Sequence, residues 1–156
     1  MPGYKTHLVG GCATYLIILQ CIKSFQPTVF MLMQGFVFCL LGSLFPDVDI
    51  KSKGQNLFYV CAFMTLCCFL YYNRIDLFIG LSLAVFTPLL VKHRGIFHKI
   101  WFLMLLSLVM GIIIDSFHAK NSTWALKNAL FFLAGALSHV LLDRVTTRLK
   151  YWFIRK

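Results

Sequence analysis

Six long apolar stretches follow one another along this chain, separated by short polar connections. They are Leu8–Ile22, Thr28–Phe45, Leu57–Tyr72, Ile75–Val91, Ile100–Phe117 and Trp124–Leu142. A membrane-spanning helix needs about 20 apolar residues, with about 17 as a lower limit, and these stretches lie near that limit. None shows the polar face of a surface helix in a soluble protein. The sequence predicts an all-α integral membrane bundle of about six transmembrane helices, forming a single domain over residues 1–156.

The composition and the helix-breaking residues agree with this division. The chain is 60% hydrophobic, against about 45–50% in an ordinary soluble domain. Pro27 stands at the start of the second stretch, and Pro46 stands just past its end, where it is expected to release the next residues from helical geometry. No A-x-A-like cleavage site ends the first stretch, so we expect residues 1–22 to be retained in the mature protein.

Lysine and arginine are distributed unevenly over the connections. Threading six helices alternately across a membrane leaves four of the 15 on one side, namely Lys23, Arg74, Lys120 and Lys127. The other eleven (15 − 4) lie on the side that carries the N-terminus. Because positive charge in short loops marks the cytoplasmic side, both termini are expected to be cytoplasmic.

The same threading gathers most of the histidines and acids at one end of the bundle. Asp76, Asp115 and His118 fall at the opposite end. The end with the N-terminus receives His7, Asp47, Asp49, His93, His98, His139 and Asp143. Ionisable residues near a membrane are costly and tend to be functional, so this set is the candidate site.

Each motif taken alone also has a simpler structural interpretation. "HVLLD" places His139 and Asp143 at i and i+4 on one helix face, where they could form a helix-end hydrogen bond. "PDVD" could be a capped turn, "KHRGIFHKI" a basic interfacial loop, and His7 alone says little. The functional interpretation therefore depends on the seven residues meeting in space.

Imidazole and carboxylate ligands together suit zinc, with manganese or iron as alternatives. The site contains no thiolate, which argues against a closed structural zinc site. Seven ligands exceed the three plus water that one catalytic metal usually takes, so one or two divalent ions are expected, with a bridging Asp in the second case. Such an ion lowers the pKa of its water to about 7. Asp49 and His93 are the catalytic candidates, with a non-ligand Asp as general base.

Three segments carry a family resemblance. "LGSLFPDVDIKS", "HRGIFHK" and "GALSHVLLDRVT", with His7 ahead of the first helix, resemble the PDxD, HRGxTHS and SHxxxDxxT segments of the YdjM-like bacterial inner-membrane proteins, which are classed as membrane-bound metal-dependent hydrolases. Phe97 and Lys99 replace the usual Thr and Ser around His98, and Ile50 stands where a His often follows the second Asp. The resemblance implies a hydrolase in the inner membrane and names no substrate.

Together these features predict hydrolysis of an ester or phosphoester on an anionic, amphiphilic substrate at the cytoplasmic face. Arg94, Lys99 and Lys51 border the site and suit an anionic head group, although they could instead serve only to orient the protein in the membrane. The tail "RVTTRLKYWFIRK" mixes basic and aromatic residues as interfacial anchors do, which indicates contact with membrane lipids rather than nucleic acid.

Two other functions compete with hydrolysis. A transporter for metal ions or protons usually holds its site near the bilayer midplane on broken helices, and here only Pro88 hints at a broken helix. A non-catalytic scaffold would use the metal to hold the helix ends together. An open coordination position would distinguish the enzyme from this scaffold.

Overall fold

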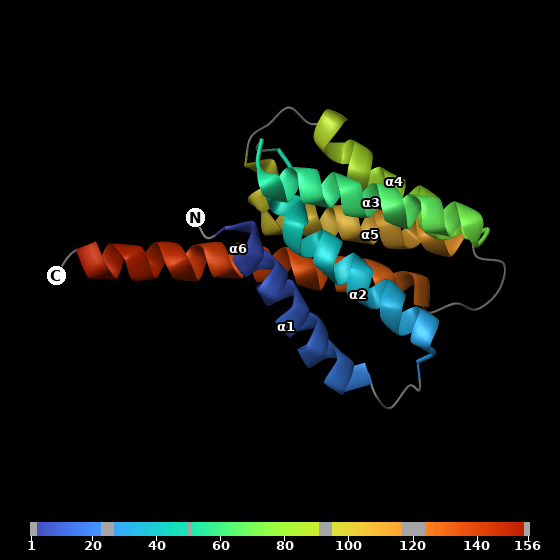
Figure 1. The fold of residues 1–156 in the computed structure, drawn as a ribbon, viewed down its shortest axis with the longest axis horizontal. Coiled ribbons are helices and arrows are strands. Elements are labelled where there is room, and N and C mark those ends of the chain that lie inside the picture. The colour runs from blue at the N-terminus through green and yellow to red at the C-terminus, as the bar shows by residue number, and fades with distance from the viewer. Residues whose placement is uncertain (1–2, 23–26, 50, 91–94, 117–123, 155–156) are drawn as a thin grey trace.

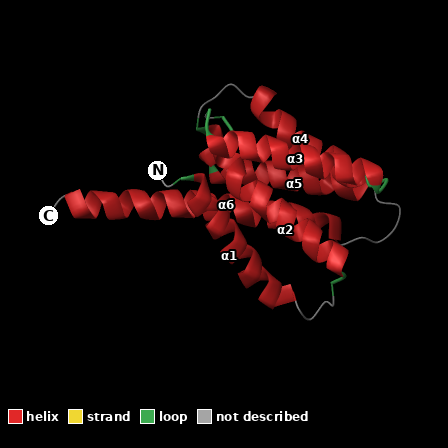
Figure 2. Cartoon of the chain, viewed as in Figure 1, coloured by secondary structure: helices red, strands yellow, loops and turns green. Residues whose placement is uncertain are grey.

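The computed structural model describes residues 3–22, 27–49, 51–90, 95–116 and 124–154. All regular structure in these ranges is helical, with no strand (Figure 2). The elements are α1 (Tyr4–Ile22), α2 (Val29–Leu44), η2 (Phe45–Asp47), α3 (Lys53–Tyr71), α4 (Ile75–Leu90), η3 (Ile96–His98), α5 (Ile100–Ser116) and α6 (Trp124–Ile154). The expected all-α bundle of about six long helices is confirmed.

The lengths and composition of these helices suit a membrane. Four segments are long and apolar enough to cross it, namely Tyr4–Ile22, Val29–Asp47, Lys53–Tyr71 and Leu126–Arg148, and α4 and α5 contribute two shorter apolar helices. Their outer faces are apolar too, since Ile17, Phe63 and Leu141 are each more than 60% exposed. Large apolar side chains left on the outside are expected where the surrounding solvent is lipid.

Helix boundaries differ from the apolar stretches where polar residues continue a helix. Helix α3 begins at Lys53 rather than Leu57, because the Ser52 side chain accepts a hydrogen bond from the Gln55 backbone N–H at 3.1 Å and caps the first turn. Helix α6 continues past Leu142 to Ile154 and extends from the bundle as a single helix (Figure 1). The basic and aromatic tail is therefore helical as far as residue 154.

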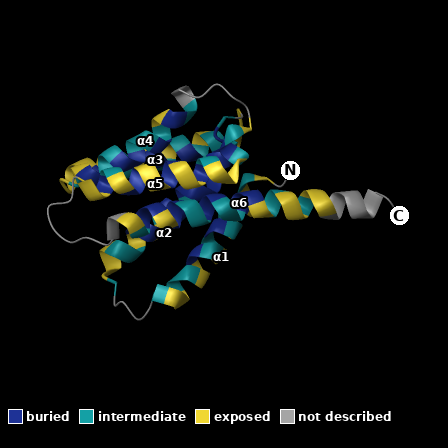
Figure 3. Ribbon diagram, turned by 180° about the vertical axis from the view of Figure 1, so that it is seen from behind, coloured by how far each residue is buried: buried dark blue, intermediate teal, exposed yellow. Residues whose placement is uncertain are grey.

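The backbones of α2 and α6 are in direct contact at the centre of the bundle. A Cβ atom at Gly42 would overlap the backbone carbonyl of Phe132, and one at Gly135 would overlap the backbone carbonyl of Cys39. Small residues allow this close approach between membrane helices. Both helices turn buried faces toward the bundle (Figure 3). Helix α2 leads into η2, which carries Asp47, and α6 carries His139. The contact between α2 and α6 therefore fixes the positions of Asp47 and His139 relative to each other.

Candidate metal centre

Helix α2 passes directly into η2 and so delivers Asp47 to the end of the bundle. Pro46 lies past the end of α2 at Leu44, as the sequence suggested, but inside a 3-10 turn that keeps the next residue in helical geometry. The turn accommodates it because the first residues of a helix need no intrahelical N–H donor. Asp47 therefore has a fixed helical backbone, and only Val48 and Asp49 enter the following turn.

His98 is delivered by η3, whose position depends on Gly95 and Phe97. Gly95 begins the turn with a φ of 86°, a left-handed conformation that glycine adopts readily. Phe97 is fully buried, and its ring packs edge-on against Phe45 at a centroid distance of 5.5 Å. Phe45 lies in η2 beside Asp47, so one aromatic contact joins the two short turns that carry Asp47 and His98.

Four side chains converge at this end of the bundle: Asp47, His98, His139 and Asp143, with one ligand atom from each within 4.8 Å of all the others. The Nε2 atom of His98 lies 3.5 Å from Asp47 Oδ1 and 3.4 Å from Asp143 Oδ2. The Nε2 atom of His139 lies 3.4 Å from Asp47 Oδ1 and 3.5 Å from Asp143 Oδ2. Imidazole nitrogen and carboxylate oxygen therefore alternate around one point.

These separations match the edges of a tetrahedral zinc site. Zinc binds nitrogen and oxygen at about 2.0–2.2 Å, and tetrahedral ligands then lie about 3.3–3.6 Å apart. The four measured separations of 3.4–3.5 Å fall in that range. They are longer than typical N–H···O hydrogen bonds of about 2.9–3.0 Å. The donor set and its spacing thus fit a divalent metal better than a hydrogen-bonded network.

His139 is held in the orientation that a metal ligand requires. Its side chain is fully buried, and its Nδ1 lies 2.7 Å from the backbone carbonyl of Ser43. A carbonyl accepts only, so Nδ1 carries the proton and donates it, which leaves the lone pair of Nε2 pointing into the cluster. Histidine ligands commonly donate their second N–H to such an outer partner.

His7 extends the cluster on the side of α1. Its ring stacks on that of His139 with a centroid distance of 3.6 Å and an interplanar angle of 12°. Its Nε2 lies 3.7 Å from Asp143 Oδ1, whereas Asp143 Oδ2 faces His98 and His139. The two oxygens of Asp143 therefore face different histidines, His7 on one side and His98 with His139 on the other, so Asp143 would be able to contribute to either of two ions.

Several buried polar atoms of the cluster and of the neighbouring Asp49 have no hydrogen-bond partner among the described residues. They are Asp47 Oδ1, Asp49 Oδ1, His98 Nε2, His139 Nε2 and Asp143 Oδ1. Each such atom costs about 1–3 kcal/mol when it is buried without a partner. A bound cation would compensate for this cost, because every one of these atoms is a potential ligand.

Negative charge is concentrated at the cluster. Interaction with the Asp47 carboxylate raises the pKa of the His98 imidazole, against the lowering effect of burial, and the charges of Asp143 and Asp49 act in the same direction. Asp49 is therefore within electrostatic range of the cluster although it is not among the four converging residues. Three carboxylates around one imidazole make a strongly cation-attracting site.

The other predicted site residues are distributed as follows. His93 and Arg94 lie outside the described residues. Lys51 and Lys99 are exposed. Lys51 lies two residues after Asp49, and Lys99 directly follows His98. Sequence reasoning missed the Ser43 carbonyl, which as a backbone group leaves no sequence signal, and the anchoring Phe97, whose only signal was its departure from the family pattern.

The acids expected at the opposite end do lie apart from the cluster. Asp76 begins α4 and pairs with Arg74 at 2.8 Å, and Asp115 is exposed at the end of α5. His118 lies outside the described residues. We predict that Asp76→Ala and Asp115→Ala proteins retain wild-type metal content, measured by elemental analysis of the folded protein. Loss of metal from either variant, with helical content unchanged, would contradict the separation of the two ends.

Comparison with known proteins gives one match. The family model described as YdjM inner membrane protein matches residues 1–153. None of the curated proteins matches the chain, and no solved structure does so.

Proposed function

The chain belongs to the YdjM inner membrane protein family, and on that premise we propose that it is a membrane-embedded, metal-dependent hydrolase. Its substrate would be an ester or phosphoester of an amphiphilic molecule at the membrane surface. The observation that carries the proposal is the ring of alternating imidazole and carboxylate atoms at 3.4–3.5 Å.

The chain's own residues divide into those that hold a metal and those that act beside it. Asp47, His98, His139 and Asp143 would hold one ion, with zinc favoured and manganese or iron as alternatives. His7 and the second oxygen of Asp143 would contribute to a second. When bound, zinc supplies Lewis-acid activation of water at neutral pH.

The cluster is closed on one side and accessible on the other. The side chain of His139 is fully buried, whereas those of Asp47 and His98 are 22% and 24% exposed. Water and substrate would approach from that side. Asp49 and His93 are the proposed groups for proton transfer, and Lys51, Lys99 and Arg94 are proposed to attract an anionic head group.

The hydrolase proposal is tested by separating metal binding from turnover. Metal-loaded protein is incubated with liposomes of bacterial inner-membrane lipids, and the products are identified by mass spectrometry. We expect metal-dependent loss of one lipid class that a chelator abolishes. Asp49→Asn should retain the ion held by the four converging residues and reduce turnover at least about 100-fold, the lower range for loss of general-base catalysis. Wild-type turnover in Asp49→Asn would remove Asp49 from the mechanism.

A structural metal site is the second candidate, because four protein donors can complete a tetrahedral zinc site. The absorption spectrum of the cobalt-substituted protein distinguishes the two functions. A four-coordinate spectrum that is unchanged by inorganic phosphate would favour the scaffold, and a spectrum that shifts on phosphate addition would favour the enzyme. Transport is less well supported, because Asp47 and His98 lie in short turns at one end of the bundle and α4 is continuous through Pro88.

The orientation of the site is a separate prediction. The excess of lysine and arginine on the side of the N-terminus should place Lys5 and Lys156 in the cytoplasm, together with the cluster. Reporter fusions at each terminus, one active only in the cytoplasm and one only in the periplasm, provide the measurement. A periplasmic signal from either terminus would contradict the cytoplasmic placement.

A further inference from the structure

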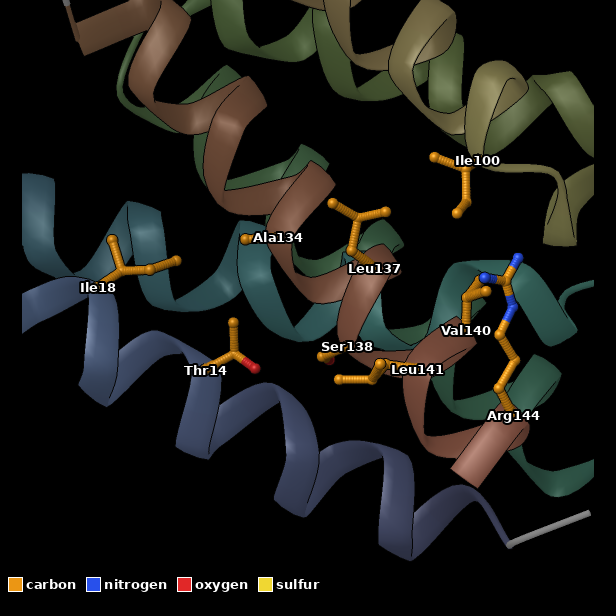
Figure 4. A pocket seen from close by; sticks show the side chains of 9 residues that line it. All are labelled: Thr14, Ile18, Ile100, Ala134, Leu137, Ser138, Val140, Leu141 and Arg144. Carbon is orange, nitrogen blue, oxygen red and sulfur yellow. The ribbon is translucent and has the colours of Figure 1, made fainter. Parts of the chain in front are cut away.

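An apolar groove crosses α6 beside the cluster. It has a volume of about 460 Å³ and is lined by Thr14 and Ile18 of α1, by Ile100 of α5, and by α6 residues Ala134, Leu137, Ser138, Val140, Leu141 and Arg144 (Figure 4). Its volume lies in the range of about 300–1,000 Å³ that is usual for ligand pockets. Among these lining side chains only Arg144 carries a charge.

The charged end of the groove is formed by residues that are close in sequence to the candidate metal centre. Arg144 follows Asp143 directly in α6, and Ile100 follows His98 by two residues. Both lie at one end of the groove, whereas Ile18 and Ala134 lie at the other (Figure 4). Arg144 is exposed, and none of the described carboxylates forms an ion pair with it. Its guanidinium is thus available to an external anion at this end of the groove.

The length of the groove matches one leaflet of a bilayer. Ten residues of α6 separate Ala134 from Arg144, which corresponds to about 15 Å along a helix. The hydrocarbon core is about 30 Å thick, so its half-thickness is the same. Leu141 is 63% exposed, so the groove opens on the outer face of the bundle rather than into its interior. An arginine at the end of an apolar groove one leaflet deep is complementary to a lipid with an anionic head group.

We propose that this groove binds an acyl chain of an anionic phospholipid, with the lipid phosphate on Arg144. Such a lipid belongs to the anionic, amphiphilic class proposed as the substrate, and this link between the groove and the cluster rests on the proposed hydrolase function. Arg144 would act as a specificity-determining residue, since a guanidinium can bind phosphate through two parallel hydrogen bonds.

The test measures lipid binding to the full chain in a neutral detergent, by native mass spectrometry with dioleoyl phosphatidic acid as the probe. Arg144→Gln should weaken binding at least about tenfold, as expected for loss of a charge-assisted hydrogen bond. Arg148→Gln removes the same charge one turn further along α6, outside the groove lining, and should leave binding close to wild type. Dioleoyl phosphatidylcholine should bind more weakly and respond little to Arg144→Gln.

A second pair of variants tests the groove itself. Ala134→Phe fills the end of the groove remote from Arg144 and should reduce phosphatidic acid binding, whereas Val145→Phe introduces the same side chain at an exposed α6 position outside the lining and should leave binding close to wild type. Equal responses to Arg144→Gln and Arg148→Gln would overturn the proposal. So would unchanged phosphatidic acid binding in a folded Ala134→Phe protein, because the groove would then not be the binding site.

Metal content and hydrolysis, measured on the same samples, separate this proposal from the proposed function. A metal-free or inactive wild type that still binds phosphatidic acid through Arg144 supports the groove and rejects only the hydrolase. If the protein is metal-loaded and active but Arg144→Gln does not change its lipid binding, only the proposal for the groove is rejected.

Discussion

Asp47→Asn protein is expected to be purified folded but without its metal. The amide has the shape of the carboxylate and preserves the 3-10 turn, but it replaces an anionic ligand with a neutral one. Asp47 Oδ1 lies 3.5 Å from His98 Nε2 and 3.4 Å from His139 Nε2, so this one atom takes part in two of the four measured edges. Loss of an outer-sphere partner alone costs about 10–100-fold in metal affinity, and loss of a direct ligand should cost at least as much.

The measurement is metal per chain by elemental analysis, with helical content from circular dichroism as the folding check. Asp115→Asn is the matched control, because it makes the same chemical change at an exposed acid at the end of α5. His139→Ala should lose metal as well, and it also removes the hydrogen bond to Ser43 and leaves a cavity beside His7. Wild-type metal content in both Asp47→Asn and His139→Ala would show that the cluster is not the binding site.

Gly135→Ala is expected to destabilise the whole bundle. Its new methyl group would overlap the backbone carbonyl of Cys39, so a rotamer change cannot relieve the clash and α2 must move away from α6. Overpacking usually costs about 1–3 kcal/mol, and a clash with backbone should lie at or above the upper end. Metal affinity should fall too, because separation of these helices moves Asp47 away from His139 and Asp143.

The thermal unfolding midpoint in detergent measures this effect. Gly111→Ala makes the identical substitution in α5, where the nearest atoms are side-chain carbons of Ala129 and Leu126 at 3.3 Å. It should change the midpoint little. A Gly135→Ala protein as stable as the Gly111→Ala protein would contradict the close contact of α2 with α6.

The sequence predicted the end of the bundle at which the candidate residues lie, because membrane helices must alternate in direction, but it did not predict which of the seven converge. Six apolar stretches assign each connection to one end of the bundle, and this rule brings His7, Asp47, His98, His139 and Asp143 together without any knowledge of packing. Hydrophobicity predicted the cores of the helices and missed their ends. The cap at Ser52 depends on a polar side chain that accepts a backbone N–H, and α6 continues to Ile154 through basic residues, so neither end is marked by apolar side chains.

The internal geometry of the cluster could not be predicted from the sequence. Asp47 and Asp49 are equivalent in "PDVD", and only the course of η2 through Pro46 directs Asp47 toward the histidines while Asp49 stays outside the four converging residues. The tautomer of His139 depends on the Ser43 carbonyl, which any residue type would provide. The groove beside Arg144 arises from the crossing of α1 and α6, and helix crossing angles are not encoded in a local motif.

Elemental analysis of the wild-type protein, purified in detergent without chelators, tests the metal centre most directly. We predict one or two divalent ions per chain, with zinc favoured, and a content that falls when Asp47 is changed to Asn and is unaffected when Asp115 is changed to Asn. A folded wild-type protein that contains no divalent metal, and takes up none when dialysed against zinc, would contradict the metal centre and the hydrolase proposed from it.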